Sequence, residues 1–230
     1  MSSTRLPGKV LQPVAGAPMI ARQIERLRRC RRLDRIVVAT STDPSDDVLV
    51  ATLRDLGVPT HRGPLDDVLG RYAGALEAHG PAEHLVRLTG DCPLADPGVI
   101  DATIALHIER GADYAANTPE RRTYPKGLDV EVMRAACLER AAAEAMQPYE
   151  REHVTPYLYR HPDLFTQAFL SQTADEGELR WTVDRPDDLE LVRAVYDALY
   201  PANPAFTSDD VRAFLRGRPD LAMLGGDRRI

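Results

Sequence analysis

Helical and strand-like segments alternate over the first half of the chain, and this alternation restricts the possible folds more than any other feature of the sequence. Apolar residues recur at helical spacing in "PMIARQIERLRRCRRL" (18–33), and a β-branched run follows in "DRIVVATST" (34–42). The same patterns predict helices over 43–57, 65–80 and 96–111 and strands over 58–63, 83–91 and 112–118. Such alternation with short connections is typical of βαβ units. We therefore expect an α/β fold with a mostly parallel sheet.

The pattern changes after residue 118. A loop over 119–127 is followed by segments that indicate strands at 128–133 and 179–184 and helices at 134–145, 185–200 and 207–221. No shift in composition marks a second domain, so we expect a single domain over residues 1–230. Within it we distinguish a first part at 1–118, an arm at 119–180 and a C-terminal part at 181–230.

Charge and cysteine content exclude several classes of function. The formal net charge is −6, which argues against nucleic acid as a partner, because phosphate binding needs a basic surface. No apolar run approaches the roughly 18 residues that a membrane helix requires. The three cysteines (Cys30, Cys92 and Cys137) are odd in number and widely spaced, which argues against a disulfide framework and favours a cytoplasmic location.

Two aspartates follow predicted strands. Asp91 comes directly after Gly90 in "RLTGDCPLADP", and Asp184 ends "LRWTVD" just before a predicted helix. Ligands of α/β sheets bind at the carboxyl ends of strands, and Mg²⁺ takes one or two carboxylates together with phosphate oxygens. Alternatively, Asp91 caps its own turn and Asp184 caps the helix. Taken together, the two aspartates favour a shared Mg²⁺ site beside a nucleotide.

The opening segment "MSSTRLPGKV" (1–10) is suited to an anion. Arg5 and Lys9 are cations, and the backbone N–H groups around Ser3, Thr4 and Gly8 could form an anion-binding concavity. The segment lacks the spacing of a Walker phosphate loop. An ordinary polar tail is the alternative.

Two later segments also hold polar groups. "TYPKGLDVEV" (123–132) places Lys126, Asp129 and Glu131 around Gly127, which suits either an acceptor pocket or a plain hairpin. "PYEREHVTPYLY" (148–159) contains a lone histidine, which is more typical of a structural role than of catalysis. Its aromatic residues are typical of a dimer contact, so we expect a homodimer.

Several stretches in this order resemble the cytidylyltransferase family that includes spore-coat polysaccharide biosynthesis protein F. The sequence is similar, more distantly, to the synthetases of CMP-3-deoxy-manno-octulosonate and CMP-N-acylneuraminate. The resemblance covers residues 2–215 and rests on "SSTRLPGKVLQPVAGAPMI", "IVVATSTDPSDD", "HRGPLDDVLGRY", "VRLTGDCPLADPGVID", "YPKGLDVEV", "YEREHVTPYLY" and "LRWTVDRPDDLELVRAVY".

The resemblance implies a Rossmann-like fold of the nucleotide-diphospho-sugar transferase type with a β-arm insertion. It also implies Mg²⁺ dependence and transfer of CMP from CTP to a sugar, acidic sugar or related acid, with release of pyrophosphate, in surface polysaccharide or natural-product biosynthesis. The first part then binds the nucleotide, the arm meets the acceptor and the second subunit, and the C-terminal part supplies a metal-binding strand.

The implied site residues fall into three groups. The nucleotide is assigned to Ser3, Thr4, Arg5, Gly8, Lys9, Thr40, Ser41, Arg62, Arg71 and Gly90, the metal to Asp91 and Asp184, and the acceptor to Tyr124, Lys126, Gly127, Asp129 and Glu131. Lys9, Arg5 and Asp91 are the expected catalytic residues. Lys126 stands where the family more often has an acidic or neutral residue, which bears on the charge of the acceptor.

The chain departs from the family at its start. Members normally have a strand, ending in an arginine, ahead of the opening loop, and here Met1 stands where the methionine of that motif belongs. We therefore expect the sheet to lack its first strand. A start assigned too far downstream, a shortened chain and a natural variant are all open explanations.

Two other functions are consistent with the same residues. A nucleotide-sugar-dependent glycosyltransferase usually carries a DxD motif after a strand, and "GDC" supplies a single aspartate there. A nucleotide-binding homologue disabled by loss of the first strand is the non-enzymatic alternative.

Overall fold

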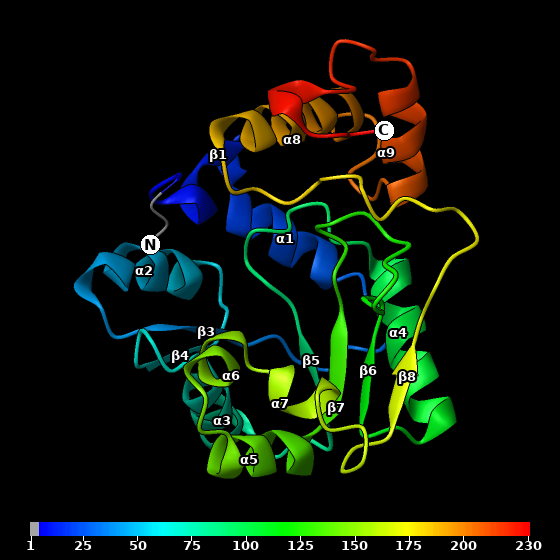
Figure 1. Cartoon of the computed structure of the whole chain (residues 1–230). Coiled ribbons are helices and arrows are strands. Elements are labelled where there is room, and N and C mark those ends of the chain that lie inside the picture. The colour runs from blue at the N-terminus through cyan, green and yellow to red at the C-terminus, as the bar shows by residue number, and fades with distance from the viewer. Residues whose placement is uncertain (1–4) are drawn as a thin grey trace.

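A computed structural model describes residues 5–230, and its strands form three sheets (Figure 1). A two-stranded sheet pairs β3 (Val38–Ser41) with β4 (Thr60–Gly63) in parallel. A larger sheet has the order β5-β7-β6-β8, and a short antiparallel hairpin joins β1 to β2. The bounds of these strands are Pro13–Val14 for β1, Ala17–Pro18 for β2, His84–Arg87 for β5, Tyr114–Ala116 for β6, Glu131–Arg134 for β7 and Gln167–Phe169 for β8.

The α/β class is confirmed, but the prediction of a mostly parallel sheet is wrong for the larger sheet. β7 runs antiparallel to both β5 and β6, and only β6 and β8 are parallel there. The reversal after β6 is fixed by the buried Asn117. Its amide donates to the carbonyl of Leu128 at 2.7 Å and accepts from the N–H of Val130 at 2.8 Å, which turns the chain back beside β6.

The segment over 119–180 contributes to the larger sheet itself. Both β7 and β8 lie in that sheet, so a separate β-arm is not confirmed.

The strand predicted at 179–184 is reduced to one isolated bridge between Lys126 and Arg180. β3 pairs with β4 and β5 with β7, and no ladder within residues 5–230 joins the two sheets. A missing first strand stays a prediction.

The predicted helices are present, and side-chain caps explain where several begin. Asp67 caps α3 by accepting from the N–H of Gly70 at 2.9 Å, and Asp96 caps α4 in the same way. α1 ends at Leu27, short of the predicted residue 33. The carboxylate of Asp101 accepts the N–H groups of Arg31 and Arg32, which holds this part of the chain in turns and not in a helix. The helices are η1 (Lys9–Leu11), α1 (Met19–Leu27), η2 (Pro44–Asp46), α2 (Asp47–Asp55), α3 (Val68–His79), α4 (Pro97–Arg110), α5 (Ala135–Glu144), α6 (Pro148–His153), α7 (Pro156–Tyr159), α8 (Pro186–Leu199), α9 (Ser208–Arg216) and η3 (Leu224–Gly226). None of the helices in the described part of the chain has the length and apolar character needed to cross a bilayer.

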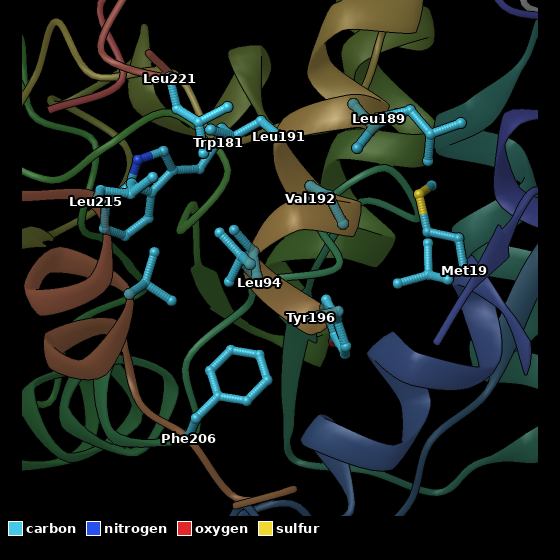
Figure 2. Close-up of a cluster of buried hydrophobic side chains, with 14 of the residues drawn as sticks. Met19, Leu94, Trp181, Leu189, Leu191, Val192, Tyr196, Phe206, Leu215 and Leu221 are labelled. Carbon is cyan, nitrogen blue, oxygen red and sulfur yellow. The ribbon is translucent and has the colours of Figure 1, made fainter. Parts of the chain in front are cut away.

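The largest buried cluster surrounds α8 and anchors the segment that leads into the site. Figure 2 shows Trp181 in this cluster together with Leu191 and Val192 of α8. The indole of Trp181 is 1% exposed, and its Nε1 donates to the carbonyl of Arg229 at 2.9 Å. Burial of a side chain of this size stabilises the fold by roughly 4 kcal/mol. Residues 182–185 are therefore held on one side by a rigid core.

Candidate active site

Asp91 and Asp184, which are far apart in sequence, lie side by side in the structure. The N–H of Val183 donates to the carbonyl of Asp91 at 2.8 Å, and Thr182 Oγ1 donates to the same carbonyl at 3.2 Å. These bonds bring Asp91, in the loop that follows β5, next to the residues that lead into α8. The structure thus places the two aspartates together, as the sequence predicts, while their role as metal ligands stays a prediction.

Lys9 connects the two carboxylates. Its Nζ donates to Asp91 Oδ2, to Asp184 Oδ1 and to the carbonyl of Val183, each at 2.9 Å. Burial alone would lower the pKa of Lys9, but the charge and hydrogen bond of Asp91 and the hydrogen bond to Asp184 outweigh it and raise the pKa. The ammonium is therefore charged and fixed at this point.

Residues 5–10 of the opening segment are consequently fixed against the site. Gly8 adopts a left-handed conformation (φ 65°) and begins η1, which points Lys9 toward the aspartates. Arg5 forms an ion pair with Asp184 at 3.2 Å, although the Arg5 side chain is largely exposed. Ser3 and Thr4 lie outside the described residues.

Asp184 is held from its other side by residues of the same turn. Arg180 donates to Asp184 Oδ2 at 2.7 Å, and the carboxylate of Asp188 accepts the N–H of Asp184 at 2.9 Å. Asp188 caps α8 and Arg185 occupies the N-cap position, so the side chain of Asp184 is not used as a cap. Burial would raise the pKa of Asp184, but hydrogen bonds from Lys9 and Arg180 lower it, and the carboxylate is ionised.

A cavity of about 1000 Å³ opens beside this cluster. Its lining includes Lys9 and Asp184, Thr40 and Arg71, and Arg151 of α6. The volume falls at the upper end of the range for small-molecule sites, which suits a nucleotide. A second cavity of about 870 Å³ between α3 and α5 is lined mainly by glycine and alanine and includes none of the predicted site residues.

Arg71 presents its guanidinium to the cavity. Its Nε is buried and has no hydrogen-bond partner among the described residues. Burial lowers the pKa of Arg71. The side-chain stem packs against Gly63, where an added Cβ would lie 3.1 Å from Arg71 Cγ. Because a buried guanidinium nitrogen without a partner is costly, the position of Arg71 favours binding of an anionic ligand.

Sequence reasoning missed two residues that shape the site. Asp67 accepts two hydrogen bonds from Arg151, at 2.7 and 2.9 Å, and this pair joins the start of α3 to α6 across the cavity. Asp188 organises the turn at Asp184 from a fully buried position. Only the helix-capping pattern could have indicated either residue, and that pattern does not distinguish a cap from a site residue.

The predicted nucleotide residues divide into two groups. Thr40 and Arg71 line the cavity with Arg5, Gly8 and Lys9, whereas Ser41, Arg62 and Gly90 lie outside its lining. Ser41 Oγ donates to Asp46 at 2.6 Å beneath the cavity. Arg62 donates to the carbonyl of Ser41 and to Asp47. Gly90 packs beneath the opening segment, against Val10.

Two of the five predicted acceptor residues, Lys126 and Gly127, lie beside the segment that leads to Asp184. The N–H of Lys126 donates to the carbonyl of Leu179 at 2.9 Å, and the N–H of Trp181 donates to the carbonyl of Lys126 at 2.8 Å. Gly127 has φ 108°, and a Cβ there would lie 2.6 Å from the backbone nitrogen of Thr182. This close approach requires glycine.

The side chains of this segment are mostly engaged within the protein. Asp129 forms an ion pair with Arg122, and Tyr124 is half-buried. Glu131 is buried and accepts from Tyr114 and Thr155, at 2.6 Å each, and from Arg87. None of the five predicted acceptor residues lines the cavity, and their acceptor role stays a prediction.

The donor set at the site fits Mg²⁺ better than a transition metal. The carboxylates of Asp91 and Asp184 already share one cation, the ammonium of Lys9, so both can approach a common point. Two carboxylates leave positions for phosphate oxygens and water, which is the coordination that Mg²⁺ prefers. Within residues 5–230 there is no group of three or more histidine, cysteine, aspartate or glutamate side chains arranged for a metal.

The three cysteines are unsuited to nucleophilic chemistry. Burial and the nearby charge of Asp91 raise the pKa of Cys92 well above its usual value. Burial also raises the pKa of Cys30 to about 12 and that of Cys137 to about 11. All three are therefore thiols at neutral pH, and the thiolate is the reactive form.

Comparison with known proteins gives consistent results. A family model described as cytidylyltransferase matches residues 1–193. Spore coat polysaccharide biosynthesis protein SpsF of Bacillus subtilis is 33% identical over 96% of this chain and 93% of its own length. A 3-deoxy-manno-octulosonate cytidylyltransferase of Anaeromyxobacter sp. (strain K) is 31% identical over 85% of this chain and 94% of its own. The structure of a cytidylyltransferase from Leptospira borgpetersenii superposes with a TM-score of 0.89 at 28% identity, covering 96% of this chain and 92% of that one.

Proposed function

Because the chain belongs to the cytidylyltransferase family, we propose that it transfers CMP from CTP to an oxygen of a sugar or acidic sugar and releases pyrophosphate. The observation that carries this proposal is the position of Lys9, hydrogen-bonded to Asp91 and Asp184 at the wall of the cavity. Two carboxylates at one point can hold a metal ion, and a lysine beside them can bind the phosphates that accompany it.

The cations around the cavity bind the triphosphate in this proposal. Lys9 and Arg5 approach from the opening segment, and Arg71 approaches from α3. Thr40 lies near the base and ribose. Asp91 and Asp184 would hold Mg²⁺, which when bound neutralises charge on the phosphates.

The reaction is a displacement at the α-phosphorus of CTP. The acceptor hydroxyl oxygen forms a bond to that phosphorus and releases its proton to water, the bond from the α-phosphorus to the bridging oxygen breaks, and pyrophosphate leaves with that oxygen. Lys9 and Arg5 offset the charge that develops on the departing group. Catalysis in such transfers is mainly positioning and charge stabilisation, which matches a site built from ionic side chains.

We propose an acidic sugar as the acceptor class to be tested first. One relative is named as a 3-deoxy-manno-octulosonate cytidylyltransferase, and another as a spore coat polysaccharide biosynthesis protein. Lys126 adds a cation to the segment that runs beside Asp184, which favours an acceptor with a carboxylate or phosphate group. The product would then serve synthesis of a surface polysaccharide.

We also propose that the protein acts as a homodimer. Tyr149 of α6 is 43% exposed and Met146, just before it, is 81% exposed, so this end of the cavity has apolar surface for a second copy. Sedimentation of the protein, with and without CTP, measures the mass of the particle. A single species of monomer mass under both conditions would contradict this part of the proposal.

The test is pyrophosphate release with each of the four nucleoside triphosphates, Mg²⁺ and a panel of acidic sugars. We expect release with CTP and with one acceptor class, and no release after chelation of the metal. Faster release with UTP or ATP would contradict cytidylyl transfer. Use of a nucleotide-sugar with release of a nucleoside diphosphate would indicate a glycosyltransferase, and nucleotide binding without turnover would indicate a disabled homologue.

A further inference from the structure

The C-terminal residues pack directly behind Asp184. The N–H of Arg180 donates to the carbonyl of Arg228, and the N–H of Arg229 donates to the carbonyl of Ala222, both at 2.9 Å. The bond from Arg180 and the bond from Trp181 Nε1 tie the C-terminal residues to the segment that precedes the site, and the bond to Ala222 holds Arg229 within its own segment. Figure 1 shows the C-terminus beside α9 at the same end of the molecule as α8.

Arg229 is fully buried, and each nitrogen of its guanidinium has a partner. Nε donates to the carbonyl of Leu224 at 3.1 Å, one terminal nitrogen donates to the carbonyl of Arg180 at 2.8 Å, and the other donates to Asp188 Oδ1 at 2.7 Å. A charge buried in this way requires a well-placed counter-charge. Arg229 and Asp188, both without exposed surface, are paired with each other.

Asp188 transmits this contact to Asp184. Its Oδ2 accepts the N–H groups of Asp184 and Arg185, at 2.9 and 3.0 Å, and so fixes the backbone of the turn. Arg180 bridges the two carboxylates, because one of its terminal nitrogens donates both to Asp188 Oδ2 at 3.0 Å and to Asp184 Oδ2 at 2.7 Å.

We propose that Arg229 is a positioning residue for Asp184, acting through Asp188 and Arg180. Arg229 neutralises part of the charge of Asp188, which leaves Arg180 available to hold Oδ2 of Asp184 while Oδ1 faces Lys9. Arg180 also donates from Nε to Asp188 Oδ1 at 3.1 Å, so without Arg229 it becomes the main counter-charge of Asp188 and is drawn away from Asp184, which loses its orientation. The inference rests on the proposed function. Arg229 also lies beyond residues 1–193, the part that the family model matches.

The variants Arg229→Met and Arg229→Lys test this role, with Leu221→Ala as the matched control. Leu221 is 4% exposed in the core cluster beneath the same C-terminal segment, so its truncation loosens that segment without removing a contact to Asp188. The readouts are Mn²⁺ affinity in the presence of CTP, measured by electron paramagnetic resonance, and the melting temperature. We expect Arg229→Met to weaken Mn²⁺ binding about tenfold, as is typical for partners of metal ligands, and Arg229→Lys to give an intermediate affinity.

Leu221→Ala should bind Mn²⁺ as the wild type does, even where its melting temperature falls as far. Equal losses of affinity in Leu221→Ala and Arg229→Met would overturn the inference, because they would show a merely structural role. Wild-type affinity in Arg229→Met would also overturn it. If Arg229→Met does not fold, Arg229→Lys decides, and wild-type affinity in that variant overturns the inference. A wild-type protein that binds no Mn²⁺ with CTP would instead refute the proposed function, and the role of Arg229 with it.

Discussion

Nζ of Lys9 lies 2.9 Å from Oδ1 of Asp184, and the same nitrogen is equally close to Asp91, so an ammonium stands between the two carboxylates proposed to hold a metal. A divalent cation that enters the free protein must therefore displace Lys9. The triphosphate offers Lys9 new partners, so it should favour metal binding, and the metal should favour triphosphate binding by the same factor.

Replacement of Lys9 by methionine should separate these two effects. Lys9→Met removes the competing cation, so Mn²⁺ should bind the free protein about tenfold more tightly, which is about 1.4 kcal/mol. CTP should then enhance Mn²⁺ binding less than it does in the wild type. Electron paramagnetic resonance titrations with and without CTP measure both quantities, and Arg140→Met on the exposed face of α5 is the control. Unchanged Mn²⁺ affinity in the free variant would contradict competition by Lys9.

Asp91→Asn should abolish turnover and leave the fold intact. The Asp91 side chain is 26% exposed and its backbone carbonyl, which holds Val183, is unaffected by the substitution. Loss of one carboxylate removes a negative charge that would hold the metal ion against the phosphates. We therefore expect pyrophosphate release to fall at least about 1000-fold. Pyrophosphate release and thermal melting are the measurements, with Asp163→Asn at an exposed position as the control. Near-normal pyrophosphate release by Asp91→Asn would contradict a role for Asp91 in the reaction.

Arg71→Met should weaken CTP binding and make the protein more stable. The buried Nε of Arg71 has no partner among the described residues, so its replacement by an apolar side chain removes a desolvation cost. We expect the free energy of unfolding to rise by about 1 kcal/mol and the KM for CTP to rise about tenfold. Urea unfolding and steady-state kinetics check the two effects. A lower stability with an unchanged KM would show that Arg71 serves the fold alone.

The sequence predicts local features of this fold well, because they depend on neighbouring residues. The caps at Asp67 and Asp96 and the apolar spacing of α8 determine helices without reference to the rest of the chain. The convergence of Asp91 and Asp184 was also predicted, but from two strand ends, whereas residues 179–184 form only an isolated bridge and the bond from Val183 to the carbonyl of Asp91 brings the two aspartates together.

Long-range pairings were not predictable in the same way. The antiparallel placement of β7 depends on the bonds of Asn117 across a loop, and a β-branched run has the same pattern in either direction. The contact of Arg229 with Asp188 joins residues 41 positions apart, and nothing near either residue indicates it. Burial of an arginine is evident only once the fold around it is known.

His107 gives the protein a pH-dependent stability that is independent of the site. It is fully buried on α4, and its Nε2 lies 3.0 Å from Nδ1 of His84. Burial and the charges of His84 and Arg134, opposed by Asp113, lower the pKa of His107 from 6.5 to about 4. The unfolded chain therefore binds this proton more readily, so the stability is fully present above pH 6.5 and is lost as the pH falls toward 4.

Between pH 7 and pH 5, His107 should account for a loss of about 2 kcal/mol in the free energy of unfolding. Urea unfolding of the wild type and of His107→Gln at both pH values measures this loss, because glutamine keeps a hydrogen-bonding group near His84 but does not titrate. The variant should lose less stability than the wild type over this interval by about that amount. Equal losses in the two proteins would mean that His107 is protonated as easily in the folded state as in the unfolded chain.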